Sequence, residues 1–413
     1  MSAERRAARE ARGQRDGDRV LVVNSGSSSV KYQIVAPDEA RRLAAGVLER
    51  IGEEPARWTH RVAGGLERVR DVRAADHREA FLHIAGELQA AGGTSLAAIG
   101  HRVVHGGARF EAPTRIDAAV LRAIRELATL APLHNPANLI GIELCADAFP
   151  GVPQVAVFDT AFHQTMPPRA YRYAVPEDWY RRLGVRRYGF HGTSHRYVAE
   201  RAAGALGRAP DACSLITLHL GNGASAAAVE RGRCVDTSMG LTPLEGLVMG
   251  TRSGDLDPAI PLHLQRVDGL SAAQVDAALN GEAGLAGLCG TNDVREILAR
   301  EEAGDERAKL ALDVYAYRVR KYVGAYSAVL GGVDALVFTG GVGENAARVR
   351  ALACAGLERL GIALDESANA AASGELCEIG RAGAPVRVFV VRTDEELQIA
   401  REALAVVRAG AAA

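Results

Sequence analysis

Two short segments have the composition of turns that bind phosphate. Residues 24–29 (Asn-Ser-Gly-Ser-Ser-Ser) and residues 221–225 (Gly-Asn-Gly-Ala-Ser) each lie between two apolar runs. Small side chains let the backbone of such a turn approach an anion closely, and apolar runs bounded by turns predict β-strands. These strands are expected at residues 19–23, 30–35, 214–220 and 226–230. One such hairpin is common without a ligand. Two of them indicate a duplicated α/β fold whose halves each offer a phosphate-binding hairpin to a shared cleft.

Arginine and histidine side chains occur repeatedly within three residues of a glycine or proline. They are Arg102, His134, His191, His195 and Arg252, and Asp159 ends a predicted strand at residues 154–158. Any one of these residues alone would usually make a structural hydrogen bond. Several of them in a chain with two phosphate-binding turns are better explained as a cluster that stabilises negative charge on a phosphoryl group during its transfer.

A third glycine-rich segment, residues 339–345 (Thr-Gly-Gly-Val-Gly-Glu-Asn), follows a predicted strand at 334–338 and precedes a predicted helix at 346–360. A glycine turn there can place flat backbone against a nucleotide and bring helix N–H groups toward phosphate. An ordinary strand-to-helix turn has the same pattern, so this segment alone leaves both interpretations open.

His191 and His195 have the i, i+4 spacing of two zinc ligands on one helix. Gly192 stands where a zinc protease carries its glutamate, so the pattern disfavours zinc.

Magnesium is the better-matched metal, because it prefers oxygen ligands and takes few of them from the protein. Asn24 and Glu395 could supply such oxygens beside the phosphates. Glu395 has a second interpretation, because Thr393 and Glu396 around it fit a helix capping box. The pattern alone does not choose between the two.

The remaining pattern alternates helices with strands, which predicts an α/β class with mixed sheets. Helices are expected at residues 116–129, 136–148, 193–206 and 305–330, and further strands at 334–338 and 386–391.

Length and composition bound the class of protein. A chain of 413 residues, 48% hydrophobic, is too long for one core and predicts two domains with a cleft. Its 49 basic and 50 acidic residues give no broad field for nucleic acid or a membrane surface. The six cysteines are scattered, and no apolar run is long enough to span a membrane. We therefore expect a soluble, cytoplasmic protein, with residues 1–18 as a disordered tail.

Several long motifs resemble acetate kinase, that is, the acetokinase family of the acetate and sugar kinase/Hsp70/actin superfamily. They occur in order at residues 20–31, 101–107, 158–163, 187–195, 219–223, 249–258 and 338–345. The resemblance implies a homodimer of chains with two duplicated ribonuclease H-like (actin-like ATPase) domains and an active-site cleft between them. The expected domains are 19–159, joined by a returning helix at 396–413, and 160–395.

The resemblance also implies roles for individual residues. Asn24 and Glu395 match the ligands of Mg²⁺, for which Mn²⁺ can substitute, and Asp159, His191 and Arg252 match the catalytic residues. The residues that match the substrate site are Arg102, Val104, Leu133, His134, Phe190 and Pro243. Those that match the ATP-binding segments are Ser27, Ser29, Lys31, His219, Leu220, Gly221, Asn222, Gly223, Asp293, Val294, Arg295, Gly341, Val342, Gly343, Glu344 and Asn345. Val294 stands where the family often has an aromatic residue, which affects only the packing of adenine.

The activity implied is reversible, Mg²⁺-dependent, in-line transfer of the ATP γ-phosphoryl group to acetate, giving acetyl phosphate and ADP. A carboxylate is already a nucleophile and needs relief from charge repulsion more than it needs a base. Arg102 could neutralise it while His191 and Arg252 hold the transferring group. Asp159 would then position groups, although a proton-transfer role stays open. The alternatives are a propionate or short-chain fatty acid kinase, a sugar kinase of the same superfamily, and a non-enzymatic ATP switch.

Overall fold

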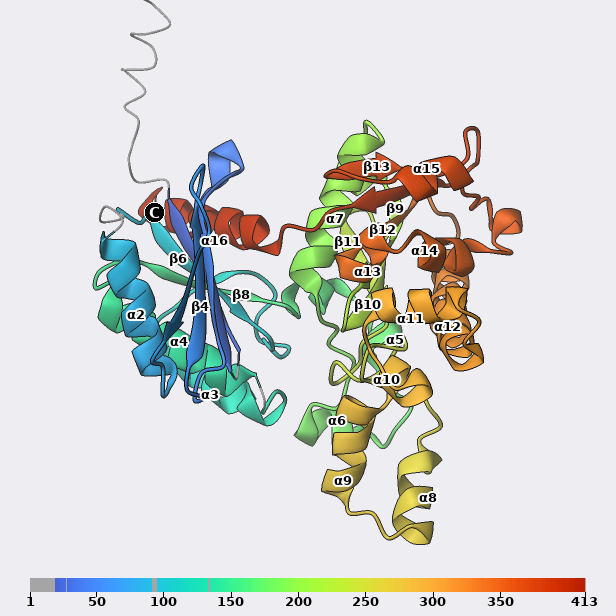
Figure 1. The fold of residues 1–413 in the computed structure, drawn as a ribbon, viewed down its shortest axis with the longest axis horizontal. Coiled ribbons are helices and arrows are strands. Elements are labelled where there is room, and N and C mark those ends of the chain that lie inside the picture. Colours follow the sequence, from blue (N-terminus) through green and yellow to red (C-terminus); the bar gives the residue numbers. More distant parts are fainter. Residues whose placement is uncertain (1–18, 27, 91–94, 133, 413) are drawn as a thin grey trace, which may run out of the picture. The chain divides into compact units, whose positions relative to one another are not determined.

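The computed structural model describes residues 19–26, 28–90, 95–132 and 134–412 (Figure 1). Ser27, Leu133 and the predicted tail at 1–18 therefore lie outside the described residues. The chain divides into two compact units. Unit 1 holds the residues up to Ala161 together with the segment from Glu395 onward, and unit 2 is Phe162–Asp394.

Over its described residues, unit 1 forms an eight-stranded mixed sheet in the order β5-β4-β3-β2-β1-β6-β8-β7. Strands β1, β6 and β8 are parallel, and β2 to β5 continue from β1 as antiparallel neighbours. The strands are β1 Val20–Ser25, β2 Ser29–Ala36, β3 Arg41–Glu49, β4 Ala56–Val62, β5 Arg68–Val72, β6 Ala98–Val103, β7 Thr114–Arg115 and β8 Gln154–Phe158.

Unit 2 lies wholly within the described residues and forms a six-stranded sheet in the order β11-β10-β9-β12-β14-β13. Strands β9, β12 and β14 are parallel, and β10, β11 and β13 are antiparallel to their neighbours. The strands are β9 Ser214–Leu220, β10 Ala224–Glu230, β11 Arg233–Thr237, β12 Ala335–Thr339, β13 Leu376–Glu378 and β14 Arg387–Val391.

The two sheets repeat one topology. In each, an antiparallel three-stranded meander (β1-β2-β3, β9-β10-β11) is extended by two parallel strands beside its first strand (β6 and β8, β12 and β14). Each sheet also ends in a short antiparallel strand, β7 or β13. The predicted duplicated α/β fold is confirmed by this repeat, and each unit carries one of the two predicted hairpins.

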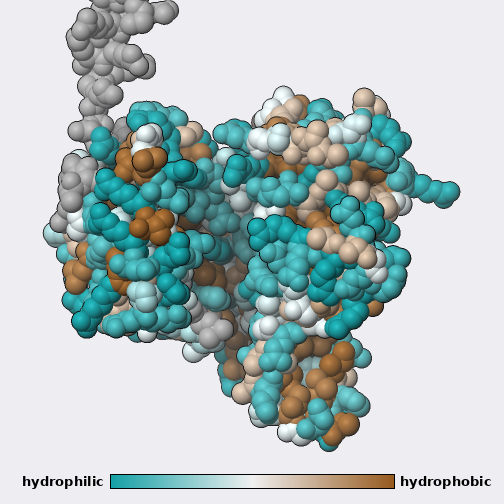
Figure 2. Space-filling model, viewed as in Figure 1, coloured by the Kyte–Doolittle hydropathy of each residue, from teal (hydrophilic) through white to brown (hydrophobic). Residues whose placement is uncertain are grey.

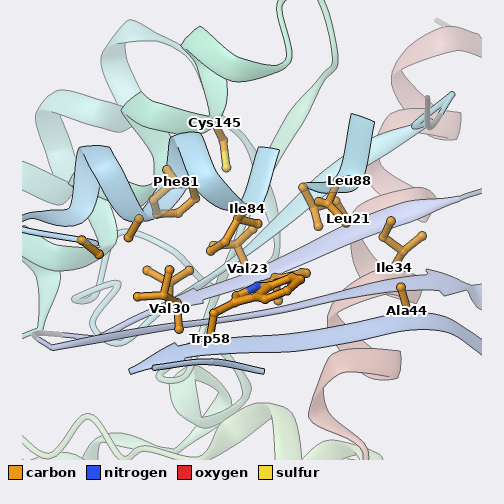
Figure 3. Close-up of a cluster of buried hydrophobic side chains, with 14 of the residues drawn as sticks. Leu21, Val23, Val30, Ile34, Ala44, Trp58, Phe81, Ile84, Leu88 and Cys145 are labelled. Carbon is orange, nitrogen blue, oxygen red and sulfur yellow. The ribbon is translucent and has the colours of Figure 1, made fainter. Parts of the chain in front are cut away.

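Helices cover both faces of the unit 1 sheet. On one face, Phe81, Ile84 and Leu88 of α2 have helical spacing and pack with Trp58 and Leu21 of the sheet (Figure 3). Fully burying each such side chain contributes about 1.5–3 kcal/mol. The helices of this unit are α2 His77–Ala90, α3 Ala118–Glu126, α4 Asn135–Ala148 and α16 Glu395–Ala412.

Helix α16 lies against β1, β6 and β8 on the other face. It comes close because β6 has a glycine, Gly100, where a Cβ atom would lie only 2.7 Å from the Ile399 side chain. This close contact places Glu395, the first residue of α16, in unit 1.

In unit 2, helix α7 lies against β9, β12 and β14, which is the arrangement that α16 has in unit 1. The helices of unit 2 are α5 Pro168–Tyr171, α6 Glu177–Leu183, α7 Gly192–Ala205, α8 Ala259–Val267, α9 Ala272–Ala277, α10 Gly284–Cys289, α11 Val294–Glu302, α12 Glu306–Leu330, α13 Gly340–Asn345, α14 Ala347–Cys354 and α15 Glu366–Ala371. Short turns of 3₁₀ or π type lie at Pro37–Glu39, Leu127–Thr129, Ala161–Thr165, Pro210–Ala212, Ala278–Glu282 and Glu358–Leu360.

Most predicted elements occur close to their expected bounds. Helix α12 is capped by Asp305, which accepts from two backbone N–H groups, and it ends at Gly331 in the left-handed conformation. The helix predicted at 346–360 is present but shorter, because α14 covers only Ala347–Cys354 and a 3₁₀ turn forms at Glu358–Leu360. The glycine-rich segment before it, predicted as a turn, forms the short helix α13. Among the described residues, no helix combines the length and the apolar character needed to cross a membrane.

Candidate active site

Unit 1 brings Arg102 and Asp159 together at the carboxyl ends of two neighbouring parallel strands. Arg102 lies on β6, and Asp159 directly follows β8. Arg102 Nε donates to Asp159 Oδ1 over 2.9 Å, and Arg102 Nη2 donates to Oδ2 over 2.6 Å. The Asp159 side chain is 2% exposed, and its backbone N–H donates to Val103 O over 3.0 Å. The two-point ion pair therefore fixes both side chains in one orientation.

A second carboxylate faces the same guanidinium. Glu395 Oε2 lies 4.0 Å from Arg102 Nε. Burial by itself favours the neutral form of Arg102, but attraction to Asp159 and Glu395 outweighs burial and raises the pKa of the guanidinium. Arg102 therefore stays charged. The cluster has one positive and two negative groups, so its net charge is negative.

The first predicted turn lies in the β1–β2 hairpin and is shorter than expected. Asn24 pairs with Lys31 in the sheet register, so both residues belong to strands. The turn is closed by Gly26 N–H, which donates to Ser29 O over 2.8 Å, and His77 Nε2 lies 2.8 Å from Gly26 O. Asn24, Ser29 and Lys31 thus lie together at one end of the hairpin.

Helix α4 joins this hairpin to the residues after β6. Asn138 Oδ1 accepts from Val104 N–H over 3.1 Å, and Asn138 Nδ2 donates to Ser25 O over 2.8 Å. His134 precedes α4, and its carbonyl accepts from Asn138 N–H over 3.0 Å. Val104 and His134 are therefore tied to the same buried asparagine. The sequence analysis did not single out Asn138, although a buried amide in a helix is a detectable signal once burial is known.

In unit 2, the side chains of His191 and Arg252 border the same space over the β9–β10 turn. A Cβ atom built on Gly223 would lie 3.5 Å from both His191 Nε2 and Arg252 Nη1. Glycine at this position leaves open the space that both side chains border. Arg252 Nη1 also donates to Pro243 O over 3.0 Å, and burial lowers the pKa of Arg252. An anion over Gly223 could contact both side chains at once.

His191 is held in an unusual backbone conformation, with φ 57° and ψ 24°, at the start of α7. Left-handed conformations of non-glycine residues cost energy and concentrate at functional sites. Its ring stacks on that of His219, with 4.3 Å between centroids, and its Nδ1 lies 2.8 Å from Ser225 Oγ. The backbone, the stack and the hydrogen bond together orient the imidazole.

The second predicted turn is joined to the segment that carries Arg252. Gly221 N–H donates to Gly223 O over 3.0 Å, and Gly250 N–H donates to Asn222 O over 2.9 Å. A side chain at Gly250 would collide with Asn222, because a Cβ atom there would lie 2.0 Å from Asn222 Oδ1. Leu220, just before the turn, is fully buried.

Asp293 and Arg295, predicted to contact ATP, stand at the exposed start of α11. Asp293 Oδ1 accepts from Arg295 N–H and from Arg295 Nε, over 2.9 and 3.0 Å. The Arg295 side chain lowers the pKa of Asp293 to about 2. Asp293 therefore caps the helix, while Val294 beside it is buried.

The third glycine-rich segment forms α13 rather than an open turn. Gly340 has φ 79°, and a Cβ atom there would lie 2.7 Å from Leu220 O, so only glycine fits without strain. Glu344 Oε1 accepts from Gly340 N–H over 3.0 Å and from Thr393 N–H over 3.1 Å. Asn345 Nδ2 donates to Gly341 O over 2.9 Å. Gly341, Val342 and Gly343 lie between these anchored residues.

Two residues assigned to the substrate site belong to unit 2. Phe190 is buried, and its carbonyl oxygen lies 2.8 Å from His163 Nε2. Pro243 contributes the carbonyl oxygen that accepts from Arg252. Arg102, Val104 and His134 belong to unit 1.

Arg350 is a buried arginine that the sequence analysis missed. Its guanidinium donates to the carbonyl oxygens of Gly343 and Glu344, over 2.9 and 3.0 Å, and to Asn369 Oδ1 over 2.7 Å. The last carbonyls of a helix lack partners within it, so Arg350 completes the end of α13.

The oxygen donors Asn24 and Glu395 both belong to unit 1 and bear on a site for magnesium. Among the described residues, no three His, Cys, Asp or Glu side chains gather closely enough to hold a metal by themselves. Mg²⁺ usually takes one or two carboxylates, with water and substrate phosphates completing its shell. The amide oxygen of Asn24 and the carboxylate of Glu395 are oxygen donors of this kind, so the residues present fit such a site.

The duplicated sheets with glycine turns define an actin-like α/β protein with two related units. The chain belongs to the acetokinase family, whose model matches residues 19–401. An acetate kinase of Streptomyces griseus is 58% identical over 396 residues, which cover 94% of this chain and 96% of that protein. Among solved structures, Porphyromonas gingivalis acetate kinase matches with 44% identity and a TM-score of 0.90, over 95% of this chain and 100% of the other. A propionate kinase from Francisella tularensis matches with 42% identity and a TM-score of 0.89, over 93% and 98%. The resemblance found in the sequence is confirmed.

Proposed function

We propose that this protein is an acetate kinase, a phosphotransferase that moves the γ-phosphoryl group of ATP to the carboxylate of acetate and catalyses the reverse reaction. The observation that carries the proposal for the acceptor is the place of Arg102. The Arg102 side chain is 21% exposed, and its guanidinium is fixed by Asp159 through Nε and Nη2. Arg102 Nη1 makes no hydrogen bond to another described residue, so it is the edge that could receive a small carboxylate.

The charge of this cluster explains the need for a divalent cation. One guanidinium and two carboxylates would repel acetate, whereas Mg²⁺ bound through Asn24 and Glu395 would make the cluster net positive. When bound, the cation also neutralises charge on the nucleotide phosphates. Asp159 has both carboxylate oxygens engaged by Arg102, which supports a positioning role over proton abstraction.

In the same proposal, the residues of unit 2 act on the transferring phosphoryl group. His191 Nε2 and Arg252 Nη1 border one space over Gly223, so both can donate to its equatorial oxygens. The glycine-rich hairpin, the start of α11 and α13 are the candidate ATP-binding segments. Lys31, Ser29 and His219 complete the set proposed to lie near the phosphates.

A coupled assay of ADP formation tests the function. Acetate with ATP and Mg²⁺ should give rapid turnover, while a hexose or no acceptor should give none. Turnover with the hexose would favour a sugar kinase, and ATP hydrolysis without an acceptor would favour an ATP switch. Chelation with EDTA should abolish the reaction, and Mn²⁺ should restore part of it.

Propionate kinase is the alternative with a specific observation behind it, the match to the Francisella tularensis enzyme. The same assay with propionate separates the two. A higher kcat/KM for propionate than for acetate would replace the proposal with this alternative.

We also propose that the protein is a cytoplasmic homodimer that associates through α8. All six cysteines are free thiols, which suits a reducing compartment. No residue of α8 is buried, and Ile260, Leu262 and Val267 are exposed on it, where Figure 2 shows hydrophobic side chains gathered. Sedimentation should give a dimer for the parent and a monomer for Leu262→Glu.

A further inference from the structure

Four side chains of unit 2 form a continuous line of hydrogen bonds that includes His191. Thr217 Oγ1 lies 2.7 Å from His195 Nδ1, His195 Nε2 lies 2.8 Å from Ser225 Oγ, and Ser225 Oγ lies 2.8 Å from His191 Nδ1. Thr217, His195 and Ser225 are fully buried. None of these three is assigned a role by the proposed function.

The sheet register explains how the line is built. Ser225 of β10 is paired with His219 of β9, and Ala227 with Thr217. Because side chains alternate along a strand, Thr217 and Ser225 point to the same face of the sheet. That face is covered by α7, which contributes His195 one helical turn after His191.

The donor in each of these hydrogen bonds can be assigned by requiring that every buried proton has an acceptor. Among the described residues, His195 Nδ1 is the hydrogen-bond partner of the Thr217 hydroxyl. If Thr217 accepted from His195, its own buried proton would have no acceptor, which is costly. Thr217 therefore donates to His195 Nδ1. A neutral histidine that accepts at Nδ1 carries its proton on Nε2, so His195 donates to Ser225.

Ser225 has one hydroxyl proton and two imidazole partners. It accepts from His195 Nε2–H, so its own proton must go to His191 Nδ1. A neutral His191 that accepts at Nδ1 carries its proton on Nε2, the atom that borders the space over Gly223 with Arg252 Nη1. Burial and the neighbouring His163 and His219 lower the pKa of His195 well below its usual value, which agrees with a neutral ring in the middle of the line.

We infer that Thr217, His195 and Ser225 are positioning residues that hold His191 as the neutral tautomer with its proton on Nε2. This inference rests on the proposed function, because it gives the Nε2 proton a purpose, donation to the transferring phosphoryl group. This line of hydrogen bonds fixes the tautomer only while His191 is uncharged. A charged His191 would donate from Nδ1 to Ser225 and would require every proton in the line to reverse.

Nitrogen NMR of the ¹⁵N-histidine-labelled protein tests the tautomer directly, since protonated and unprotonated ring nitrogens of a neutral imidazole differ widely in chemical shift. The His191 signals are assigned by their loss in His191→Gln. We expect a protonated Nε2 and an unprotonated Nδ1 at neutral pH. A proton on Nδ1, alone or on both nitrogens, would overturn the inference. This readout does not depend on turnover, so it stays informative even if the protein fails to phosphorylate acetate.

Variants test the line itself. Thr217→Val keeps the side-chain shape and removes the hydroxyl proton that Thr217 donates to His195 Nδ1. His195 and Ser225 are then free to reverse their hydrogen bonds, so the Nδ1–H form of His191 should become populated. Thr237→Val is the matched control. Thr237 is equally buried at the end of β11, but its hydroxyl donates to Ala226 O and lies outside the line. Equal shifts of the His191 signals in both variants would show a general packing effect and would contradict the inference.

Kinetics supply the functional readout. Ser225→Ala should lower kcat about 10- to 100-fold, as is typical when a group that orients a functional histidine is removed. The values of KM for acetate and ATP should stay unchanged, because the lost interaction serves the transition state. Ser225→Cys, which restores a weak donor, should recover part of kcat. Unchanged kcat in folded Ser225→Ala would overturn the role of the line.

Discussion

The two units share one sheet topology, yet the side chains at the carboxyl ends of their equivalent strands are opposite in character. In unit 1, Arg102 lies near the end of β6 and Asp159 directly follows β8, and the two side chains form an ion pair. In unit 2, the equivalent strands β12 and β14 lead to Thr339 and Thr393, and the site is built from imidazoles and hydroxyls with one arginine, Arg252. The same edge of a duplicated sheet thus carries two kinds of chemistry.

This difference matches the two tasks in the proposed reaction. A small carboxylate needs a fixed charge to bind, and an ion pair that is already oriented provides one. A transferring phosphoryl group needs donors that are fixed before charge develops on it, and a continuous line of hydrogen bonds orients one of them. The units therefore differ in how they orient a donor before the reaction. Unit 1 uses an ion pair, and unit 2 uses a line of hydrogen bonds.

The helix on each sheet adds to the comparison. Helices α7 and α16 occupy equivalent positions, but α16 is joined to unit 2 through β14 and packs on the sheet of unit 1. This crossing of the chain delivers Glu395 to Arg102. The helix α7, in contrast, delivers His191 and His195 to its own unit.

The largest effect that would sharpen this contrast is expected for Arg102→Ala. Truncation leaves Asp159 buried without its partner and leaves acetate without a charge to bind. The kcat/KM for acetate should fall by a factor that corresponds to a loss of about 2–5 kcal/mol in transition-state stabilisation. ATP affinity, measured by calorimetry, should change little. Arg109→Ala is the control, since Arg109 pairs with Glu126 in an exposed ion pair of the same unit and should cost under about 1 kcal/mol. An unchanged KM and kcat for acetate in Arg102→Ala would contradict the assignment.

Arg252→Ala should show that unit 2 acts on turnover instead. Steady-state kinetics should give a kcat lower by roughly 10²-fold or more, comparable to the loss of one preorganised donor. The affinities for ATP and acetate should move less. Arg252→Lys keeps the charge but presents different donor geometry, so an intermediate kcat is expected. If substrate affinity and kcat of Arg252→Ala fell in equal proportion, Arg252 would be a binding residue.

Much of this arrangement could be predicted from local sequence. Apolar runs bounded by glycine gave the two hairpins, and Asp305 with Gly331 gave the ends of α12, because turns and caps are encoded within a few residues. The family resemblance, not local pattern, supplied the individual site residues. Their roles stay predictions.

The parts that were missed depend on partners far apart in the chain. Helix α13 was predicted as a turn because its glycines disfavour a helix, but Glu344 is fixed by Thr393, 49 residues away. The bond between Ser225 and His195 spans 30 residues, and that between Arg102 and Asp159 spans 57. No local pattern contains such pairs, so Thr217 and Arg350 carried no signal of their own, and Ser225 was predicted only as the last residue of a turn.

Acid sensitivity offers a smaller test, directed at unit 1. His101, next to Arg102 on β6, is buried, and burial lowers its pKa from 6.5 to about 4. The folded pKa lies below the unfolded one, so the stability contributed by neutral His101 is present above about pH 6.5 and is lost as pH falls toward 4. Between pH 7 and pH 5 the loss should be about 2 kcal/mol. Unfolding of His101→Gln, which cannot titrate, should show that much less acid destabilisation than the parent. Equal acid dependence in both proteins would place the sensitivity elsewhere, with buried His195 of unit 2 as the next candidate.

The smallest expected effect concerns the choice between acetate and propionate. It tests whether unit 1 selects the acyl chain length of the substrate as well as its negative charge. Val104 directly follows β6, close to Arg102 in the chain, and its backbone is fixed by Asn138. Val104→Ala removes two methyl groups where the acyl chain is proposed to lie, so the ratio of kcat/KM for propionate to that for acetate should rise. One methylene in an apolar pocket separates substrates by about 1–3 kcal/mol, and the shift should lie at the low end of that range. Val103→Ala is the matched control, because Val103 is fully buried in the core with Phe158 and Ile124. The control should lose stability by thermal unfolding but keep the parent's ratio. A ratio that moves equally in both variants, or in neither, would mean that Val104 does not border the acyl chain and that charge alone is the contribution of unit 1.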